Sequence, residues 1–308
     1  MAVRSIAAVV VTHNAATTVI GLLDSLTEAS RGGRPRTVVI DNGSTDNTRQ
    51  LLENCGSIEV LEQHNTGYAH GVNRGIATLG GAYNVLILNA DVRLMPGALD
   101  RLADRLQAAD DVGIVVPRVL DATGHVAPSL RRQPTAPRTL FEAVVGGSRA
   151  GRFGERFRPH GDGPQDVDWA TGAAMLVRAE AWGHLGPLSE AFFLYSEETE
   201  YCLRARARGW RVVCEPAAAV MHVGGDMATN DRLWALRAVN RVRLHRCLHG
   251  PFRGLAMWLA TLAFESRRAI GGQGPSRLAV RCLLRRDLDQ AARDLTVELG
   301  GDPSPMVI

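Results

Sequence analysis

The chain has 308 residues, of which 45% are hydrophobic and 22% are charged, and its formal net charge is +3. This length can bury one large core or two smaller ones, and the composition excludes a mainly disordered chain. The charge is unevenly spread, because residues 232–286 contain 12 Arg and one acid, Glu265, which leaves the rest of the chain acidic.

Cysteine usage and hydropathy favour a cytoplasmic protein. The cysteines are scattered without a CxxC pair, which favours reduced thiols over a disulfide framework or a zinc site; they are Cys55, Cys202, Cys214, Cys247 and Cys282. The first residues do not resemble a signal peptide. The longest late apolar run, residues 254–264, is far shorter than the ~20 residues that span a bilayer. We therefore expect a cytoplasmic chain, with attachment to the inner face of the cell membrane as a second possibility.

Four apolar runs predict buried strands over residues 6–11, 37–40, 58–63 and 84–88, and helices are predicted between them. This alternation predicts an α/β fold with a mostly parallel sheet flanked by helices. Such sheets bind ligands at the carboxyl ends of their strands. Here those ends carry Thr12-His13-Asn14, Asp41, the region of Asn65, and Asn89-Ala90-Asp91. Small polar residues at all four ends are typical of a nucleotide-binding site.

The pattern weakens after a further strand predicted over residues 112–120. Residues 129–164 are rich in Arg, Gly and Pro, which predicts a mobile loop or lid. Order is expected to resume at residue 168. From residue 232 the Arg-rich sequence predicts amphipathic helices.

Asp91 directly follows the buried run 84–88. It could simply cap a turn after the strand, as Asp often does. It could equally be a carboxylate ligand for Mg²⁺ or Mn²⁺, which bind through oxygen and bridge to phosphates. His222 follows another apolar strand in the same way, so a ligand role competes with a structural one.

Gly67, Gly71 and Gly75 recur every four residues and would form one smooth helix face. Glycine costs roughly 1 kcal/mol against Ala inside a helix, so three on one face need a reason. The face could allow close packing of helix on sheet, or it could leave room for a nucleotide beside Asn65 and Asn73.

Three acids, Glu197, Glu198 and Glu200, follow the aromatic run Phe192-Phe193-Leu194-Tyr195. At a helix N-terminus they would favour the helix dipole without any catalytic role. A carboxylate beside an aromatic wall also tends to hold its proton more tightly, which suits a general base. Asp41, at its strand end, could accept hydrogen bonds from a uracil or thymine imide or from ribose hydroxyls.

Seven stretches in order resemble the family 2 glycosyltransferases of the GT-A fold, particularly the rhamnosyltransferase-like branch that builds bacterial cell-surface polysaccharides. They are VVVTHN, VVIDNGSTDNT, NTGYAHGVNRGI, LILNADVRLMPGAL, VDWATGAAMLVRAEAW, FFLYSEETEYCLRARARGW and the strand ending at His222. The resemblance implies a GT-A catalytic domain over residues 1–231, with a nucleotide-sugar half (1–111) and an acceptor half (112–231). An Arg-rich helical region then follows over 232–308.

The resemblance also implies roles for individual residues. The nucleotide diphosphate sugar, dTDP- or UDP-linked, would be bound by Thr12, His13, Asn14, Asp41, Asn65, Gly67, Asn73, Asn89 and Asp91. Asp91, in the family's DxD-type position, and His222 would hold the divalent cation, Mg²⁺ or Mn²⁺. Trp169, Gly172 and Ala173 would lie towards the acceptor.

The catalytic base is where the sequence departs from the family. The usual Glu-Asp-x-Asp is here Glu197-Glu198-Thr199-Glu200, so the implied base is Glu198, one methylene longer than Asp, with Glu197 as the second candidate. The implied reaction is an inverting, metal-dependent transfer of a sugar, rhamnose by resemblance, to a hydroxyl of a glycolipid or saccharide.

Three alternatives stay open at this point. They are a catalytically inactive nucleotide-sugar binder, a transferase with a soluble small-molecule acceptor, and a helical region that pairs two subunits as a homodimer instead of contacting a membrane through 232–286. A nucleic-acid partner is not expected, because the basic segment lacks a recognisable module and the body is acidic.

Overall fold

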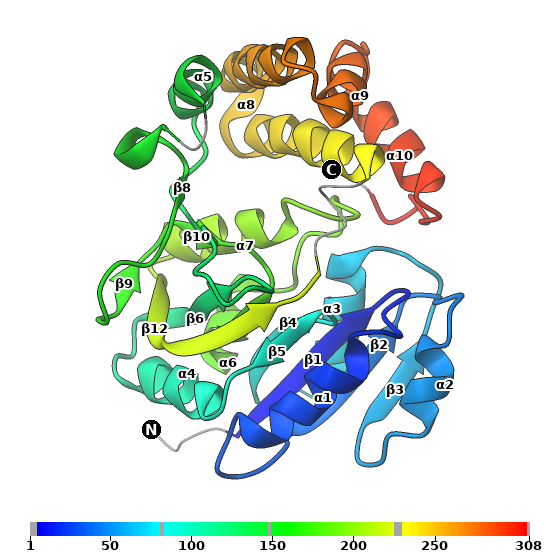
Figure 1. Ribbon diagram of the computed structural model, residues 1–308, viewed down its shortest axis with the longest axis vertical. Coiled ribbons are helices and arrows are strands. Elements are labelled where there is room, and N and C mark those ends of the chain that lie inside the picture. Colours follow the sequence, from blue (N-terminus) through cyan, green and yellow to red (C-terminus); the bar gives the residue numbers. More distant parts are fainter. Residues whose placement is uncertain (1–4, 81–82, 147–148, 225–229, 307–308) are drawn as a thin grey trace.

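The computed structural model describes residues 5–80, 83–146, 149–224 and 230–306. A large sheet with helices on both faces occupies one end of the molecule, and a layer of helices occupies the other (Figure 1). The predicted α/β fold with a mostly parallel sheet and a C-terminal helical extension is confirmed.

The main sheet has the order β3-β2-β1-β4-β11-β6-β12-β5, and β9 pairs with β12. Its strands are β1 (Ile6–Thr12), β2 (Arg36–Asp41), β3 (Glu59–Glu62), β4 (Asn84–Asn89), β5 (Val92–Leu94), β6 (Val112–Leu120), β9 (Gln165–Asp166), β11 (Ala174–Val177) and β12 (Arg211–His222). The first four strands in chain order run parallel, whereas β11 lies antiparallel between β4 and β6.

Both faces of the sheet are covered, which explains the continuous apolar strands. In β1, Ala8 and Val10 face the core beneath α1 (Val19–Glu28), α2 (Thr48–Glu53) and α4 (Ala98–Gln107). Val9 and Val11 face the opposite core beneath α3 (Tyr68–Leu79), α6 (Ala179–Leu185) and α7 (Glu197–Ala207). This two-residue alternation of side chains is the period of a strand.

The segment expected to be a mobile loop is partly regular, and that expectation was wrong. It contains β7 (Leu130–Arg131), α5 (Ala136–Val145), the 3₁₀ turn η1 (Gly151–Phe153) and β8 (Arg156–Phe157), and a small sheet has the order β10-β7-β8 with β10 (Trp169–Ala170). Thr135 caps α5 by accepting from the Arg138 N–H, and Pro137 lies in its first turn. The helix then packs beside α8, which the sequence of the segment alone could not reveal.

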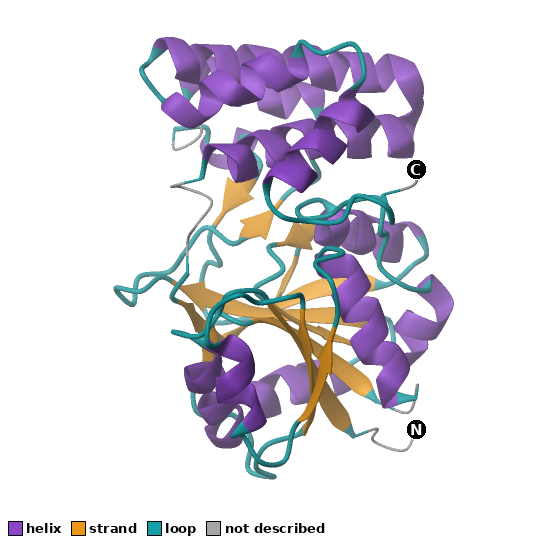
Figure 2. Cartoon of the chain, turned by 90° about the vertical axis from the view of Figure 1, so that its right-hand side faces the viewer, coloured by secondary structure: helices purple, strands orange, loops and turns teal. Residues whose placement is uncertain are grey.

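The C-terminal helices are α8 (Asp231–Ile270), α9 (Gly274–Leu283) and α10 (Leu288–Glu298). Helix α8 is broken at Gly250, whose φ is 80°, and Pro251 follows. The Trp234 indole in the first arm of α8 donates to Glu265 in the second arm at 2.9 Å, so the arms fold back on each other. Figure 2 shows the resulting helical layer beyond the sheet. In the part of the chain that the structure describes, every helix is too short or too polar to cross a membrane.

Several contacts tie the helical layer to the rest of the molecule, and two of them involve residues from the predicted site segments. The Phe193 ring packs into the apolar core that α8, α9 and α10 share. The Asp302 N–H donates to the Asn65 carbonyl at 2.7 Å. Cysteine thiols behave as predicted: all five are free.

Candidate active site

The expected polar strand ends meet at one edge of the sheet. In the parallel register Thr12 lies opposite Asp41 and Val11 opposite Asn89, so the ends of β2, β1 and β4 are neighbours. The Asp41 carboxylate is buried and accepts from the Thr12 hydroxyl at 2.9 Å. It also accepts from the Ser44 hydroxyl at 2.5 Å and the Ser44 N–H at 3.1 Å. These bonds use three of the about four acceptor positions of a carboxylate.

His13 and Asn14 join the loop after β1 to the loop after β2. The His13 Nδ1 lies 2.9 Å from the Asn42 carbonyl. Asn14 has a left-handed φ of 51°, and its side-chain oxygen accepts from the Thr45 N–H at 2.8 Å. Both side chains are exposed at the sheet edge. They fix the loop geometry and remain accessible to a ligand.

Gly67 lies where only glycine fits. Its φ is 98°, and a Cβ there would stand 2.6 Å from the Phe193 carbonyl oxygen. The same carbonyl accepts from the Tyr68 N–H at 2.9 Å, and the Gly67 carbonyl accepts from the Asn42 amide at 3.1 Å. The start of α3 is therefore held against the aromatic segment 192–195. Asn65, two residues before Gly67, is half-buried.

Asn73 of α3 is bonded to the segment 188–190. Its amide nitrogen donates to the Leu188 carbonyl at 3.0 Å and to Glu190 at 2.7 Å, and its oxygen accepts from the Leu188 N–H at 2.9 Å. These bonds give Asn73 a role in holding α3 to that segment, besides the place beside the nucleotide that the sequence predicts.

Asp91 and His222 are neighbours across two paired strands. Asp91 lies in the tight turn between β4 and β5, and the antiparallel register of β5 and β12 puts His222 opposite Val92. The His222 Nε2 is 3.0 Å from the Asp91 Oδ2. This hydrogen bond outweighs partial burial and raises the pKa of His222.

One carboxylate and one imidazole form a donor set that fits a divalent cation completed by substrate phosphates and water. Backbone at Gly224 closes round this pair, since a Cβ there would lie 1.7 Å from the Asp91 Oδ2. Residues 5–80, 83–146, 149–224 and 230–306 contain no group of three or more His, Cys, Asp or Glu that could hold a metal alone. A cation at this place would therefore depend on its substrate for further ligands.

The three acids at the start of α7 have different surroundings. Glu200 is paired with Arg204, with nitrogen–oxygen distances of 2.9 Å. Glu197 is only 3% exposed and Glu198 is half-buried, and one oxygen of each is buried without a hydrogen-bond partner among the described residues. Burial, joined by the charge of Glu198, raises the pKa of Glu197 well above its usual range, and burial also raises the pKa of Glu198.

The backbone before α7 explains why these acids point inward. Tyr195 and Ser196 both have left-handed φ values, 66° and 86°, which are uncommon for residues with a side chain. Such backbone strain is often found at functional sites. The two residues turn the chain sharply between the aromatic run and the helix, and Glu197 and Glu198 follow at once.

Tyr68 connects the acids of α7 with Asp91, although the sequence analysis did not select it. Its hydroxyl is buried and has no hydrogen-bond partner in the described chain. Burial raises the pKa of Tyr68 well above its usual range, and the charges of Glu197, Glu198 and Asp91 add to the shift. An aromatic residue directly after Asn65-Thr66-Gly67 was the available signal.

Trp169, Gly172 and Ala173 lie on the other side of the acids. A Cβ on Gly172 would stand 3.6 Å from the Glu198 Cβ, and the Ala173 carbonyl accepts from the Asn89 N–H at 3.1 Å. The Trp169 ring is buried, and its N–H donates to the Arg132 carbonyl at 3.1 Å. Gly172 and Ala173 therefore lie between Asn89, at the end of β4, and Glu198.

Comparisons with known proteins agree on one family. The profile described as glycosyl transferase family 2 matches residues 7–164. An N-acetylglucosaminyl-diphospho-decaprenol L-rhamnosyltransferase of Mycobacterium tuberculosis is 31% identical over 273 residues, 82% of this chain and 86% of that protein. The low-salt glycan biosynthesis hexosyltransferase Agl10 of Haloferax volcanii is 31% identical over 55% of this chain and 52% of its own.

Solved structures agree with this result at the level of the fold. The mannosyltransferase PcManGT from Pyrobaculum calidifontis, in complex with GDP-Man and Mn²⁺, aligns with a TM-score of 0.53 and 18% identity, covering 96% of this chain and 85% of that one. S. aureus TarS 1-349 in complex with UDP-GlcNAc aligns with a TM-score of 0.52 and 13% identity, covering 98% and 84%.

Proposed function

The chain belongs to glycosyl transferase family 2 and is a glycosyltransferase that uses a nucleotide sugar, and we propose that it moves L-rhamnose from a dTDP- or UDP-linked donor to a hydroxyl of a diphosphate-linked glycolipid. The 31% identical mycobacterial relative is named for rhamnosyl transfer to such a lipid, which supports this choice of sugar and acceptor. The observation that carries the proposed chemistry is that the Asp91–His222 pair and Glu198 lie at the same end of β4. Asp91 follows β4, and the Ala173 carbonyl accepts from Asn89 of β4 while a Cβ on Gly172 would stand 3.6 Å from the Glu198 Cβ. A cation-binding carboxylate and a base would then share one site.

The donor would lie along the ends of β2, β1 and β4. Asp41 and the exposed His13 and Asn14 would contact base and ribose at this edge, and the diphosphate would lie towards Asp91. Asp91 and His222 would hold a divalent cation, which when bound supplies Lewis-acid stabilisation of the leaving diphosphate.

Glu198 would remove the proton from the acceptor hydroxyl as that oxygen attacks the anomeric carbon. Burial raises the pKa of Glu198, which makes its carboxylate a better proton acceptor. Attack opposite to the leaving diphosphate gives inversion in one displacement. Glu197, which is more deeply buried, is the second candidate.

Attachment to a membrane surface is part of the proposal. Six exposed apolar side chains on α5 and the second arm of α8, here called the outer apolar face, support it; they are Leu140, Phe141, Val144, Phe252, Leu255 and Leu259. Phe252 is 88% exposed and Val144 is 70% exposed. Arg253 on the same arm and Arg149 after α5 are exposed and would contact anionic headgroups.

The test is sugar transfer by the purified protein. The donors are dTDP-L-rhamnose and a panel of UDP-sugars, the acceptor is a short-chain N-acetylglucosaminyl-diphosphoprenol, and each reaction is run with Mg²⁺, with Mn²⁺ and with chelator. We expect rhamnosyl transfer that chelator removes. Asp91→Asn and Glu198→Gln should each lower kcat at least ~100-fold, whereas Glu59→Gln, on the exposed edge of β3, should not.

The anomeric configuration of the product tests inversion directly. Glu198→Gln should retain nucleotide affinity, because a base acts on the acceptor and not on the donor. Nucleotide binding without transfer to this acceptor from any donor in the panel would contradict the proposed reaction and favour a binding protein.

A further inference from the structure

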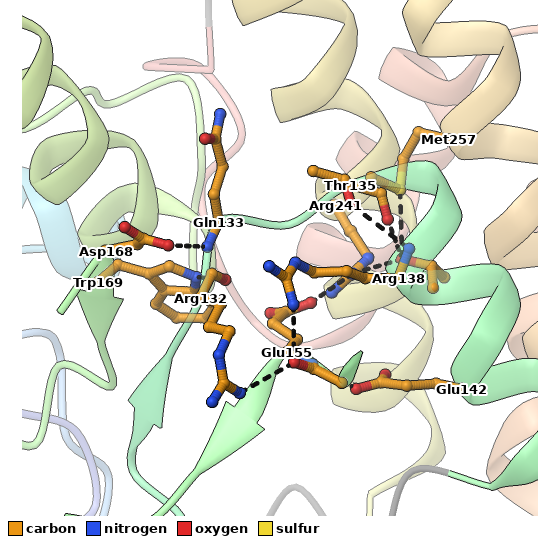
Figure 3. Close-up of polar contacts among 12 residues, drawn as sticks. Arg132, Gln133, Thr135, Arg138, Glu142, Glu155, Asp168, Trp169, Arg241 and Met257 are labelled. Atoms are coloured by element: carbon orange, nitrogen blue, oxygen red, sulfur yellow. Dashed lines mark hydrogen bonds and ion pairs between the residues drawn. The ribbon is translucent and has the colours of Figure 1, made fainter. Parts of the chain in front are cut away.

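A group of arginines lies between the segment 130–157 and the first arm of α8. Arg241 forms an ion pair with the buried carboxylate of Glu155, Arg237 lies one helical turn before Arg241 on α8, and Arg131 lies opposite Arg156, the residue after Glu155. The charges of all three arginines lower the pKa of Glu155. We call these three arginines the arginine cluster. Figure 3 shows Arg241 of α8 and Glu155 pointing towards each other beside Thr135 and Met257.

Among the described residues, Arg241 is the one member of the arginine cluster that is paired with an acid. Its guanidinium is 2.5 Å from the Glu155 carboxylate and donates to the Thr139 hydroxyl at 2.6 Å. This pair holds α8 to α5 and to the loop before β8. It also uses the one carboxylate at the centre of the cluster.

Arg131 and Arg237 have no such partner among the described residues. Arg131 donates to the backbone carbonyls of Pro128 and Leu130 and stacks on Trp169, with 5.5 Å between guanidinium and ring centre. Arg237 stacks on Trp234 at 4.2 Å, and its Nε is buried without a hydrogen bond. Two guanidiniums therefore face the same region without a carboxylate in contact.

The pKa values of Arg131 and Arg237 are both lowered, as expected for buried arginines without an ion pair. Burial lowers the pKa of Arg131 to about 10 and that of Arg237 to about 10. Arg156 repels both, and Glu265, which acts on Arg237, is already bound to the Trp234 indole. A buried charge is normally paired, because an unpaired one costs several kcal/mol. Four arginines, Arg131, Arg156, Arg237 and Arg241, thus interact here with three acids, Glu155, Glu198 and Glu265, so positive charge is in excess.

Arg131 also lies close to the proposed base. It is opposite Trp169 in the pairing of β7 with β10, and three residues further on a Cβ on Gly172 would stand 3.6 Å from the Glu198 Cβ. The Arg131 charge opposes the rise in the pKa of Glu198. Both arginines retain partial exposure, so a ligand can reach them.

We propose that Arg131 and Arg237 bind the diphosphate of the acceptor lipid. The inference rests on the proposed function and adds to it the place where the acceptor's anionic group is held. Guanidinium groups bind phosphate oxygens through paired N–H donors, and two of them match two phosphates. With the diphosphate at these arginines, the sugar next to it would extend towards Glu198. The same chemistry could serve the donor's diphosphate, and the experiment separates these two sources.

The experiment compares Arg131→Gln, Arg237→Gln and the double variant with the wild type. Arg267→Gln, at an exposed arginine on the same helix α8 to which no binding role is assigned, is the matched control. Calorimetry without divalent cation measures the affinity for farnesyl diphosphate and for inorganic pyrophosphate. Steady-state kinetics measure KM separately for the N-acetylglucosaminyl-diphosphoprenol acceptor and for the nucleotide sugar.

We expect each single variant to weaken farnesyl diphosphate binding and raise the acceptor KM about 10- to 100-fold, the loss typical of a charged hydrogen bond. The donor KM should change less than twofold, and Arg267→Gln should resemble the wild type. Arg237→Gln should not lower Tm, because no acid in the described part of the chain forms an ion pair with Arg237.

Three results would overturn the proposal. The first is a wild type that does not bind farnesyl diphosphate. The second is a raised donor KM with an unchanged acceptor KM, which would assign the arginines to the donor. The third is a lowered Tm with unchanged diphosphate affinity, which would make them structural. The binding arm needs no turnover, so it still decides the matter if rhamnosyl transfer itself is not observed.

Discussion

Glu197 and Glu198 show what a residue type can and cannot reveal. Their sequence, after an aromatic run, indicated an unusual environment, and both have a raised pKa and a buried oxygen without a partner. The pairing of Glu200 with Arg204 separates it from the other two, and only coordinates could show this. Asn73 was assigned from a motif, which could not reveal that its amide also bonds to the backbone of Leu188, a contact between residues 115 positions apart.

The raised pKa of Glu197 gives a prediction for stability. A carboxyl group that binds its proton more tightly when folded contributes stability at low pH and loses it as pH rises through the folded pKa. At a pH above its pKa in the unfolded state, the buried Glu197 carboxyl lowers the stability of the folded protein because its charged form is disfavoured there. Glu197→Gln removes this cost, since Gln does not ionise. We expect the variant to be more stable than the wild type at pH 8, by about 1 kcal/mol or more, and the difference to shrink towards pH 5.

Thermal unfolding of both proteins from pH 5 to pH 8 measures this difference. Glu59→Gln, on the surface, should show no such trend. A Glu197→Gln variant that is less stable than the wild type at every pH would mean that the carboxyl group has a stabilising partner.

At the scale of elements, the strands were predictable and their order was not. Apolar runs predicted β1, β2, β4 and β6 because each is buried on both faces, and they predicted β3, which is half-buried at the edge of the sheet. The antiparallel position of β11 between β4 and β6 depends on pairing between distant segments. Helix α5 was missed because its stretch is rich in Arg, Gly and Pro and its apolar side packs on α8. The glycine face of α3 was noticed, and the structure gives it a packing role: a Cβ on Gly75 would be 2.5 Å from Val9.

We therefore expect Gly75→Ala to destabilise the fold by about 1–3 kcal/mol through overpacking, despite the better helix propensity of Ala. Val9→Ala in the same chain should recover part of that loss, because it removes the Val9 methyl group that the new Cβ at position 75 would meet. Urea unfolding of both single variants and the double variant gives the coupling energy.

Gly183 in α6 is the matched control, because a Cβ there would meet no atom within 4 Å. Gly183→Ala should be neutral or stabilising by up to about 1 kcal/mol. Additive effects of Gly75→Ala and Val9→Ala would show that helix α3 shifts away from β1 to make room.

At the scale of the whole molecule, charge and apolar surface are separated. The residues outside 232–286, which include the sheet and the helices that cover it, have a net negative charge. The Arg-rich helices form the opposite end of the molecule (Figure 1). The outer apolar face lies on α5 and the second arm of α8, within that basic end. Composition showed the excess of arginine, but only the packing of α5 on α8 joined the apolar residues of two distant segments.

This arrangement predicts binding to anionic vesicles. The wild type should co-sediment with phosphatidylglycerol–phosphatidylcholine vesicles, less with phosphatidylcholine alone, and less at high salt. Phe252→Ser with Leu255→Ser should reduce binding several-fold. Val297→Ser, an exposed apolar residue on α10, is the control. Equal binding by all variants would place the contact elsewhere.

The helical layer is attached at more than one place. The chain enters it at Asn230, Phe193 is inserted into its core, and Asp302 returns to the Asn65 carbonyl. A layer attached at one point could rotate as a rigid body away from the sheet, whereas attachment at several separate points resists such a rotation. Any widening around Glu198 would then come from side-chain rotation and movement of short loops. Arg131 and Arg237 would keep their positions relative to the sheet.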